Sequence, residues 1–216
     1  MAKNGIFVTF KHHLKEYASL YIFVSVILLF GVIFGAIIVN SMNVSQKQDV
    51  LTFLTQFFGQ VHNEGFVNGK DVFVTSYSTH LKFIALIWIL GISVIGLPLI
   101  IILLFLKGLV IGFTVGFFVN QLGWNGMLLA FTTVFPQNII VLPFYIVITV
   151  LAIQLSIRMI QKQFLKNDRE PIIKHLISYT VIFTITAMSL SIASLIEAYG
   201  STYFLKVIAD LILKKN

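Results

Sequence analysis

The chain contains a long stretch without a charged side chain, LYIFVSVILLFGVIFGAIIV, from Leu20 to Val39. An α-helix rises 1.5 Å per residue, so a stretch of this length spans the roughly 30 Å hydrocarbon core of a bilayer. A second charge-free run of 21 residues extends from Leu176 to Ile196. Between them, the 75 residues from Phe83 to Ile157 carry a single charge, that of Lys107. This length suits three further spans joined by short turns.

The composition also favours lipid as the solvent. Hydrophobic residues make up 58% of the chain and charged residues 11%, whereas soluble domains carry roughly 25% charged residues. The net charge is +7, but the 15 Lys and Arg are spread along the chain, so nucleic acid is not an expected partner. The predicted fold class is therefore all-α: a polytopic membrane helix bundle with about five transmembrane helices plus amphipathic interfacial helices, with the lipid bilayer as a partner.

Turn signals set the predicted span boundaries. The outer turn is Asn120 to Gly126, which is polar and glycine-rich and has a Trp of the interfacial kind. The inner turn is favoured at Gly96-Leu97-Pro98, where Gly ends one helix and Pro starts the next; Lys107-Gly108 remains the alternative. Pro136 and Pro143 interrupt the fourth span. The prediction is one membrane domain over residues 1–216, with spans at about 20–39, 78–96, 98–119, 127–157 and 176–196 and an extracytoplasmic loop over 40–76.

Basic residues predict the orientation. The N-terminal tail carries Lys3, Lys11 and Lys15, and the segment between spans four and five carries five more basic residues. With five spans both regions lie on one side, which the positive-inside rule assigns to the cytoplasm. The expected location is the cell membrane, with several spans and a cytoplasmic N-terminus.

Three segments outside the spans have apolar stripes at helical spacing. They begin near Ile6, Leu51 and Phe204, and Ser45 to Gln48 resembles a capping box before the second stripe. Such helices lie in the membrane interface or pack on the bundle. Docking of a partner is the alternative role.

Small residues recur every four positions in two spans. Gly31 and Gly35 form a G-x-x-x-G motif, and Gly108, Gly112 and Gly116 form a longer ladder. Such grooves allow two helix backbones to approach closely. Packing within the bundle is favoured over an interface with another membrane protein, and a homo-oligomer remains open.

Lys107 is the exceptional residue. If its span starts at Pro98, Lys107 lies about 14 Å deep, near the midplane, where a charge usually faces protein or water. A midplane polar cluster is therefore predicted around it, formed by Lys107, Thr132, Thr133, Pro136, Gln137 and Asn138. Because Pro136 leaves the Thr132 carbonyl without its usual donor, Lys107 is expected to donate to this break. In the alternative, Lys107 marks a cytoplasmic turn and snorkels.

No catalytic, cofactor or metal site is expected. The sequence contains no cysteine, no Walker loop and no H-E-x-x-H or G-x-S-x-G motif. The adjacent His12 and His13 point to different sides of a helix. His62, His80 and His175 fall near span boundaries, where a polar residue needs no special explanation. The chain is therefore not expected to be an enzyme.

Four segments carry a resemblance that runs over nearly the whole chain: Gly31–Asn40 (GVIFGAIIVN), Trp88–Pro98 (WILGISVIGLP), Leu106–Gly116 (LKGLVIGFTVG) and Phe135–Asn138 (FPQN). The chain resembles the stage II sporulation protein M family of polytopic membrane proteins. The broader family of related membrane proteins typically has a Pro-His-Gly-x-x-Glu-like motif in the fourth span. The matching stretch here, Pro136 to Val141, lacks the His and the Glu, so an ionisable role is not carried over to it.

The resemblance implies a role in endospore formation. Family members are understood as membrane scaffolds in the mother-cell septal and engulfing membrane, where they recruit the peptidoglycan-remodelling stage II sporulation proteins D and P. The alternative is a small-solute transporter or channel that uses Lys107 and the Pro-broken fourth span. Against it, the chain has few intramembrane polar groups.

Overall fold

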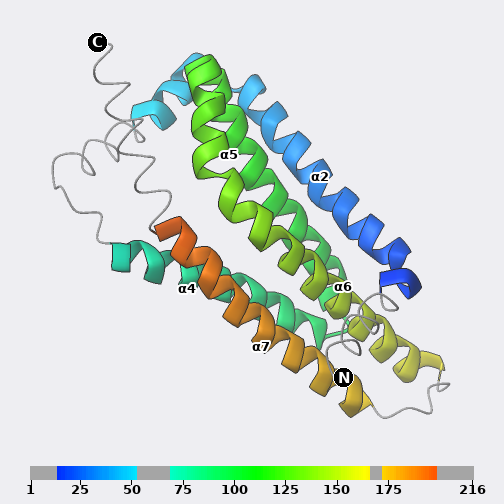
Figure 1. Ribbon diagram of the computed structural model, residues 1–216. Coiled ribbons are helices and arrows are strands. Elements are labelled where there is room, and N and C mark those ends of the chain that lie inside the picture. The colour runs from blue at the N-terminus through cyan, green and yellow to red at the C-terminus, as the bar shows by residue number, and fades with distance from the viewer. Residues whose placement is uncertain (1–13, 53–68, 166–171, 199–216) are drawn as a thin grey trace.

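The computed structural model describes residues 14–52, 69–165 and 172–198, and every long element in them is helical. These elements are α2 (Ala18–Ser41), α4 (Gly69–Gly91), α5 (Gly96–Thr133), α6 (Phe135–Leu165) and α7 (Ile172–Ile196) (Figure 1). All five are long and apolar enough to cross a membrane. The prediction of an all-α membrane bundle with about five spans is confirmed.

The segment α5 consists of two helices that run in opposite directions. Gly123 has φ 57° and ψ −129°, a conformation that strongly favours glycine. A Cβ added at Gly126 would lie 1.8 Å from the Phe118 carbonyl oxygen, so the chain folds back on itself here. The reversal lies within the predicted outer turn. The third span therefore ends near Leu122, and the fourth begins at the Trp that follows Gly123.

The fourth span is broken at Val134, where α5 ends and α6 begins. Pro136 is the second residue of α6, a position at which the missing N–H would have no helical acceptor in any case. Pro143 lies inside α6, which continues through it to Leu165. The expected interruption at Pro143 is therefore wrong, and the break belongs to the Val134–Pro136 segment alone.

The inner turn occupies residues 92–95, between the end of α4 at Gly91 and the start of α5 at Gly96. A Cβ at Gly96 would lie 1.8 Å from the Leu90 carbonyl oxygen, so the tight turn requires glycine there. Ser156 on α6 donates to the carbonyls of Gly91 and Ser93, at 3.1 and 3.2 Å, and so caps the end of α4. The alternative turn at Lys107-Gly108 is wrong, because both residues lie inside α5.

The second helix is longer than predicted at its start. α4 begins at Gly69, nine residues before the expected Ser78, because polar residues made this segment look like part of a loop. Its first turns include Thr75 and Ser76, which line a cavity inside the bundle. Their polarity therefore matches the cavity that they line.

The helices form two pairs with α6 between them. α2 lies along α5, and α4 lies along α7 (Figure 1). α6 contacts all four other helices and provides the largest share of the buried core. Its Tyr145 and Ile148 are fully buried, as is Ile84 of α4. Many other apolar side chains face outward, including Leu29, 58% exposed, as expected for a surface in contact with lipid.

A short helix over residues 44–52 follows α2. The Gln46 side chain accepts a hydrogen bond from the Asn43 N–H at 3.0 Å, so the capping box is Asn43 to Gln46. The predicted box at Ser45 to Gln48 is wrong by two residues. The remainder of this stripe, the N-terminal stripe up to residue 13 and all of the C-terminal stripe lie outside the described residues.

Candidate functional site: a polar cavity between the helices

The glycines of the two predicted ladders face each other across α2 and α5. A Cβ at Gly31 would lie 2.3 Å from the Phe105 carbonyl oxygen, and one at Gly35 would lie 2.1 Å from that of Leu109. On the other helix, a Cβ at Gly112 would lie 1.9 Å from the Val32 carbonyl oxygen. Gly108 and Gly116 approach α2 in the same way, against Leu28 and Ala36. These glycines pack the two backbones together within one chain.

Lys107 lies in α5 and its side chain is half-buried. Its ammonium is 5.8 Å from the centroid of the Phe83 ring and 5.4 Å from that of Tyr145, within the range of cation–π contact. Within the described residues it makes no hydrogen bond to the Thr132 carbonyl. The expected donation to the helix break is therefore wrong, because the ring faces of α4 and α6 hold the ammonium elsewhere.

The other predicted members of the midplane cluster divide into two groups. Thr132 and Thr133 bond back to their own helix, with 2.9 and 2.7 Å hydrogen bonds to the carbonyls of Leu128 and Leu129, and Pro136 is exposed. Gln137 and Asn138 line the same cavity as Lys107. Asn138 Nδ2 also donates to the Val134 carbonyl at 2.7 Å, which satisfies an acceptor at the break.

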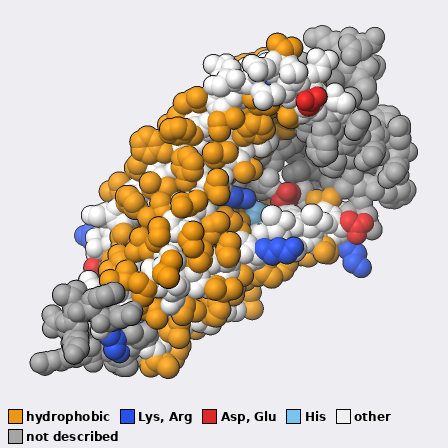
Figure 2. All heavy atoms as spheres, turned by 180° about the vertical axis from the view of Figure 1, so that it is seen from behind, with side chains coloured by type: hydrophobic (Ala, Val, Ile, Leu, Met, Phe, Trp, Pro, Cys, Tyr) orange, Lys and Arg blue, Asp and Glu red, His pale blue; other side chains and the backbone are white. Residues whose placement is uncertain are grey.

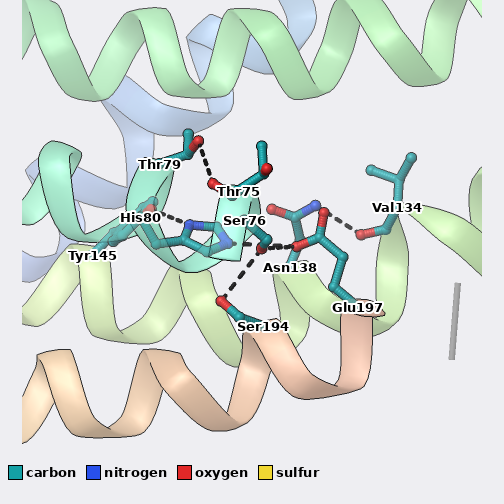
Figure 3. Close-up of polar contacts among 9 residues, drawn as sticks. All are labelled: Thr75, Ser76, Thr79, His80, Val134, Asn138, Tyr145, Ser194 and Glu197. Carbon is teal, nitrogen blue, oxygen red and sulfur yellow. Dashed lines mark hydrogen bonds and ion pairs between the residues drawn. The ribbon is translucent and has the colours of Figure 1, made fainter. Parts of the chain in front are cut away.

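A network of polar side chains, which we call the Glu197 cluster, joins α4, α6 and α7 (Figure 3). It contains Ser76, His80, Tyr145, Ser194 and Glu197. His80, only 7% exposed, has Nδ1 2.6 Å from the Tyr145 hydroxyl and Nε2 3.7 Å from Glu197 Oε2. Ser76 donates to Glu197 Oε2 and lies 3.3 Å from the Ser194 hydroxyl. Which of His80 Nδ1 and the Tyr145 hydroxyl donates in this contact depends on the tautomer of the ring.

Gln137 is a further donor to the carboxylate. With its amide nitrogen toward Glu197, it donates to Oε1 at 3.0 Å and to Oε2 at 2.6 Å. Glu197 lies one residue beyond the end of α7. Burial raises the pKa of its carboxyl, but hydrogen bonds from His80 and Ser76 and the nearby positive charges lower it by more. The net effect is a pKa below the ordinary value, so Glu197 is an anion at neutral pH.

The cavity beside this cluster has a volume of about 550 Å³ and lies between α4 and α5. The helix break of α6 and the end of α7 contribute Asn138 and Glu197 to its wall. In Figure 2 basic, acidic and histidine side chains meet at a hollow beside an otherwise apolar face. Lys107 lies eleven residues after the start of α5, or about 16 Å along the helix, so the cavity reaches hydrocarbon depth.

Sequence reasoning did not single out His80, Tyr145, Ser194 or Glu197. The position of His80 near a span boundary predicts an ordinary polar residue, yet its side chain is buried and hydrogen-bonded. One signal was available: Glu197 is the first acidic residue after Glu170 and directly follows the charge-free run that ends at Ile196. A charge in that position has either a partner or access to water.

A second polar contact lies at the opposite end of the bundle. Arg158 on α6 has its Nη1 2.9 Å from Nε2 of His175 on α7, and its Nη2 donates to the Tyr17 hydroxyl at 3.4 Å. These contacts connect the two helices that flank the basic segment to the start of α2. Among the described residues, no group of three or more His, Asp or Glu is placed to hold a metal ion.

Comparison with known proteins gives the family. The model for stage II sporulation protein M matches residues 24–202, which reaches all five helices. This chain belongs to the stage II sporulation protein M family. The resemblance seen in the sequence is thereby confirmed, and the chain is a multi-pass membrane protein related to sporulation. No curated protein and no solved structure is significantly similar to it.

Proposed function

We propose that this chain is a non-enzymatic membrane scaffold required for engulfment during endospore formation. It recruits peptidoglycan-remodelling partners, the stage II sporulation proteins D and P, to the mother-cell septal and engulfing membrane. The observation that carries the proposal is the family match over residues 24–202. The distribution of basic residues supports a cytoplasmic N-terminus, which puts the helix over 44–52 on the side of the cell wall.

The exposed start of this short helix is the proposed docking point for a partner. Val44 is 79% exposed and Leu51 is 37% exposed, so the helix presents apolar side chains away from the bundle. Such a surface is suited to a protein partner outside the membrane. The glycines of α2 and α5 are already used within the chain, so docking through those grooves is not part of the proposal.

Co-purification tests the scaffold. The tagged chain, extracted from sporulating cells in mild detergent, is expected to retain both partners, whereas an unrelated tagged multi-pass protein retains neither. In a deletion strain the partners are expected to lose their septal localisation. Unchanged partner localisation in that strain would exclude the scaffold.

The docking point has a matched pair of variants. Val44→Asp places a charge at the exposed apolar position and is expected to reduce partner recovery strongly. Ser45→Asp adds the same charge to the neighbouring exposed residue without removing an apolar side chain, and recovery is expected to stay near that of the unmodified chain. Equal recovery with both variants would place the docking surface elsewhere.

A small-solute transporter is the second candidate, favoured by the charged cavity at hydrocarbon depth. It predicts solute flux in reconstituted vesicles that Lys107→Ala abolishes. The absence of any flux in vesicles in which the protein is folded would rule out this candidate and leave the scaffold proposal unaffected.

A further inference from the structure

The cavity contains a cation, Lys107, and an anion, Glu197, that do not pair with each other, and the exposed Asp71 near the start of α4 adds a second carboxylate to its wall. The Lys107 ammonium rests against aromatic rings, and in the described part of the chain it has no carboxylate within ion-pair distance. Glu197 is held from the opposite side by Ser76 and His80. Among the described residues, this half-buried ammonium therefore has no hydrogen-bond acceptor for its three N–H donors.

These two charges restrict the chemistry of a ligand. A purely anionic ligand at Lys107 meets the negative charge of Glu197, and a purely cationic ligand at Glu197 meets Lys107. A head group that carries one charge of each sign satisfies both. The Thr79 hydroxyl, which donates to the Thr75 carbonyl at 2.8 Å, still has lone pairs to accept from an ammonium.

The walls of the cavity favour a ligand that comes from the membrane. The α4 wall is polar, with Thr75, Ser76 and Thr79, whereas the α5 wall contains Val110 and Ile111. Val110 is 57% exposed, so the apolar wall continues onto the lipid-facing surface of α5. A head group in the cavity therefore has an apolar path along α5 for its acyl chains.

We propose that this cavity binds the zwitterionic head group of an aminophospholipid, with its phosphate paired to Lys107 and its primary ammonium paired to Glu197. The apolar wall at Val110 accommodates the first part of the acyl chains. Lipid binding at this site does not require partner recruitment, so failure of either proposal leaves the other unaffected.

Native mass spectrometry of the full chain in detergent tests the head-group chemistry. Phosphatidylethanolamine is expected to bind about tenfold more tightly than phosphatidylglycerol, which lacks the ammonium, and phosphatidylcholine, whose ammonium has no N–H to donate. The three lipids carry identical acyl chains, so only the head group differs. Phosphatidylglycerol binding as tightly as phosphatidylethanolamine would overturn the proposal.

Two variants locate the site. Lys107→Met and Glu197→Gln are each expected to weaken phosphatidylethanolamine binding about tenfold. Lys82→Met removes an exposed lysine of α4 that does not line the cavity and is expected to leave binding unchanged. A similar loss with Lys82→Met would overturn the assignment. Should Lys107→Met fail to fold, the lipid series on the unmodified chain still decides the head-group chemistry.

A soluble competitor separates the two sources of this head group. Free glycerophosphoethanolamine carries the same charges, one phosphodiester anion and one primary ammonium, without acyl chains. It is expected to displace the lipid only at much higher concentration, because it lacks the contact with the apolar wall. Displacement at an equal concentration would overturn the assignment to a lipid.

Discussion

The hydrogen bond between Ser76 and Glu197 connects residues 121 positions apart in the chain. Such a contact holds the end of α7 against α4 at the wall of the polar cavity. Each oxygen of the carboxylate has a donor, so the buried charge is satisfied. Removing one partner therefore costs more than the hydrogen bond itself contributes.

Tyr145→Phe is expected to destabilise the protein by about 1–3 kcal/mol, because it leaves His80 Nδ1 buried without a partner. The measurement is reversible unfolding in mixed detergent micelles. Tyr77→Phe removes the same hydroxyl from a half-buried ring that stacks on Phe73, and its effect should stay below about 0.5 kcal/mol. In a double-mutant cycle, the loss should be mostly absent when His80 is already Ala; full additivity would contradict the contact.

The Glu197 carboxyl predicts a stability that falls in acid. Its pKa in the folded protein lies below the ordinary 4.5, so the folded state favours the charged form. This contribution is fully present above pH 4.5 and is lost as the pH falls through the folded value. Thermal unfolding measured from about pH 6 to about pH 3 should show a smaller acid loss for Glu197→Gln than for the unmodified chain. Asp49→Asn is the control; the same acid loss in both variants would contradict the prediction.

At this scale only part of the site could be predicted from the sequence. Lys107, Gln137 and Asn138 were recognisable as candidate site residues, because a polar side chain inside an apolar run is costly unless it has a partner. His80 and Glu197 stand near the ends of such runs, where water is the default partner. Only the packing of α4, α6 and α7 brings them inside, and local sequence carries no information about which helix packs against which.

Among the elements, α2 and α5 form the closest pair. The buried residues of α2 recur along one stripe and include Val24, Leu28, Gly31 and Gly35, while the remainder of the helix faces outward. With no hydrophobic force between helices in lipid, close backbone approach and van der Waals contact hold the pair together. The G-x-x-x-G spacing predicted this kind of contact; the identity of the partner helix required the structure.

Gly112→Ala is expected to separate the two helices, because the new Cβ would lie 1.9 Å from the backbone oxygen of Val32. The expected loss of unfolding free energy is about 1–3 kcal/mol, measured by detergent-induced unfolding. Gly116→Ala is a graded comparison, since its Cβ meets Ala36 at 3.1 Å, and a loss below about 1 kcal/mol is expected. Equal effects of the two substitutions would contradict this geometry.

For the whole molecule, the thickness of the bilayer made the number of helices predictable. The boundaries of the helices were harder to predict from the sequence. The start of α4 was placed nine residues late, because its polar residues face a cavity that the sequence does not reveal. The reversal at Gly123 was predictable from a glycine-rich turn. The continuation of α6 through Pro143 was not, because it depends on neighbouring helices that satisfy the backbone groups freed by a proline.

Single cysteines test the predicted orientation, since the chain has none of its own. Ser45→Cys and Lys162→Cys lie at opposite ends of the bundle and are both exposed. A membrane-impermeant maleimide is applied to intact cells whose envelope lets it reach the outer face of the cell membrane. It should then label position 45 only. After permeabilisation it should label both. Labelling of position 162 in intact cells would reverse the topology and move the helix over 44–52 to the cytoplasm.

The pairing of α2 with α5 has a consequence for biogenesis. The ribosome completes α2 at Ser41 but does not reach Gly116, the last glycine of the facing ladder, until 75 residues later. At typical rates of synthesis this interval lasts about 4–15 seconds. During it, the grooved face of the nascent helix has only lipid or the insertion machinery to cover it. Docking of the first span therefore waits for the third, and α6, which contacts every other helix, completes its packing only after α7 enters the bilayer.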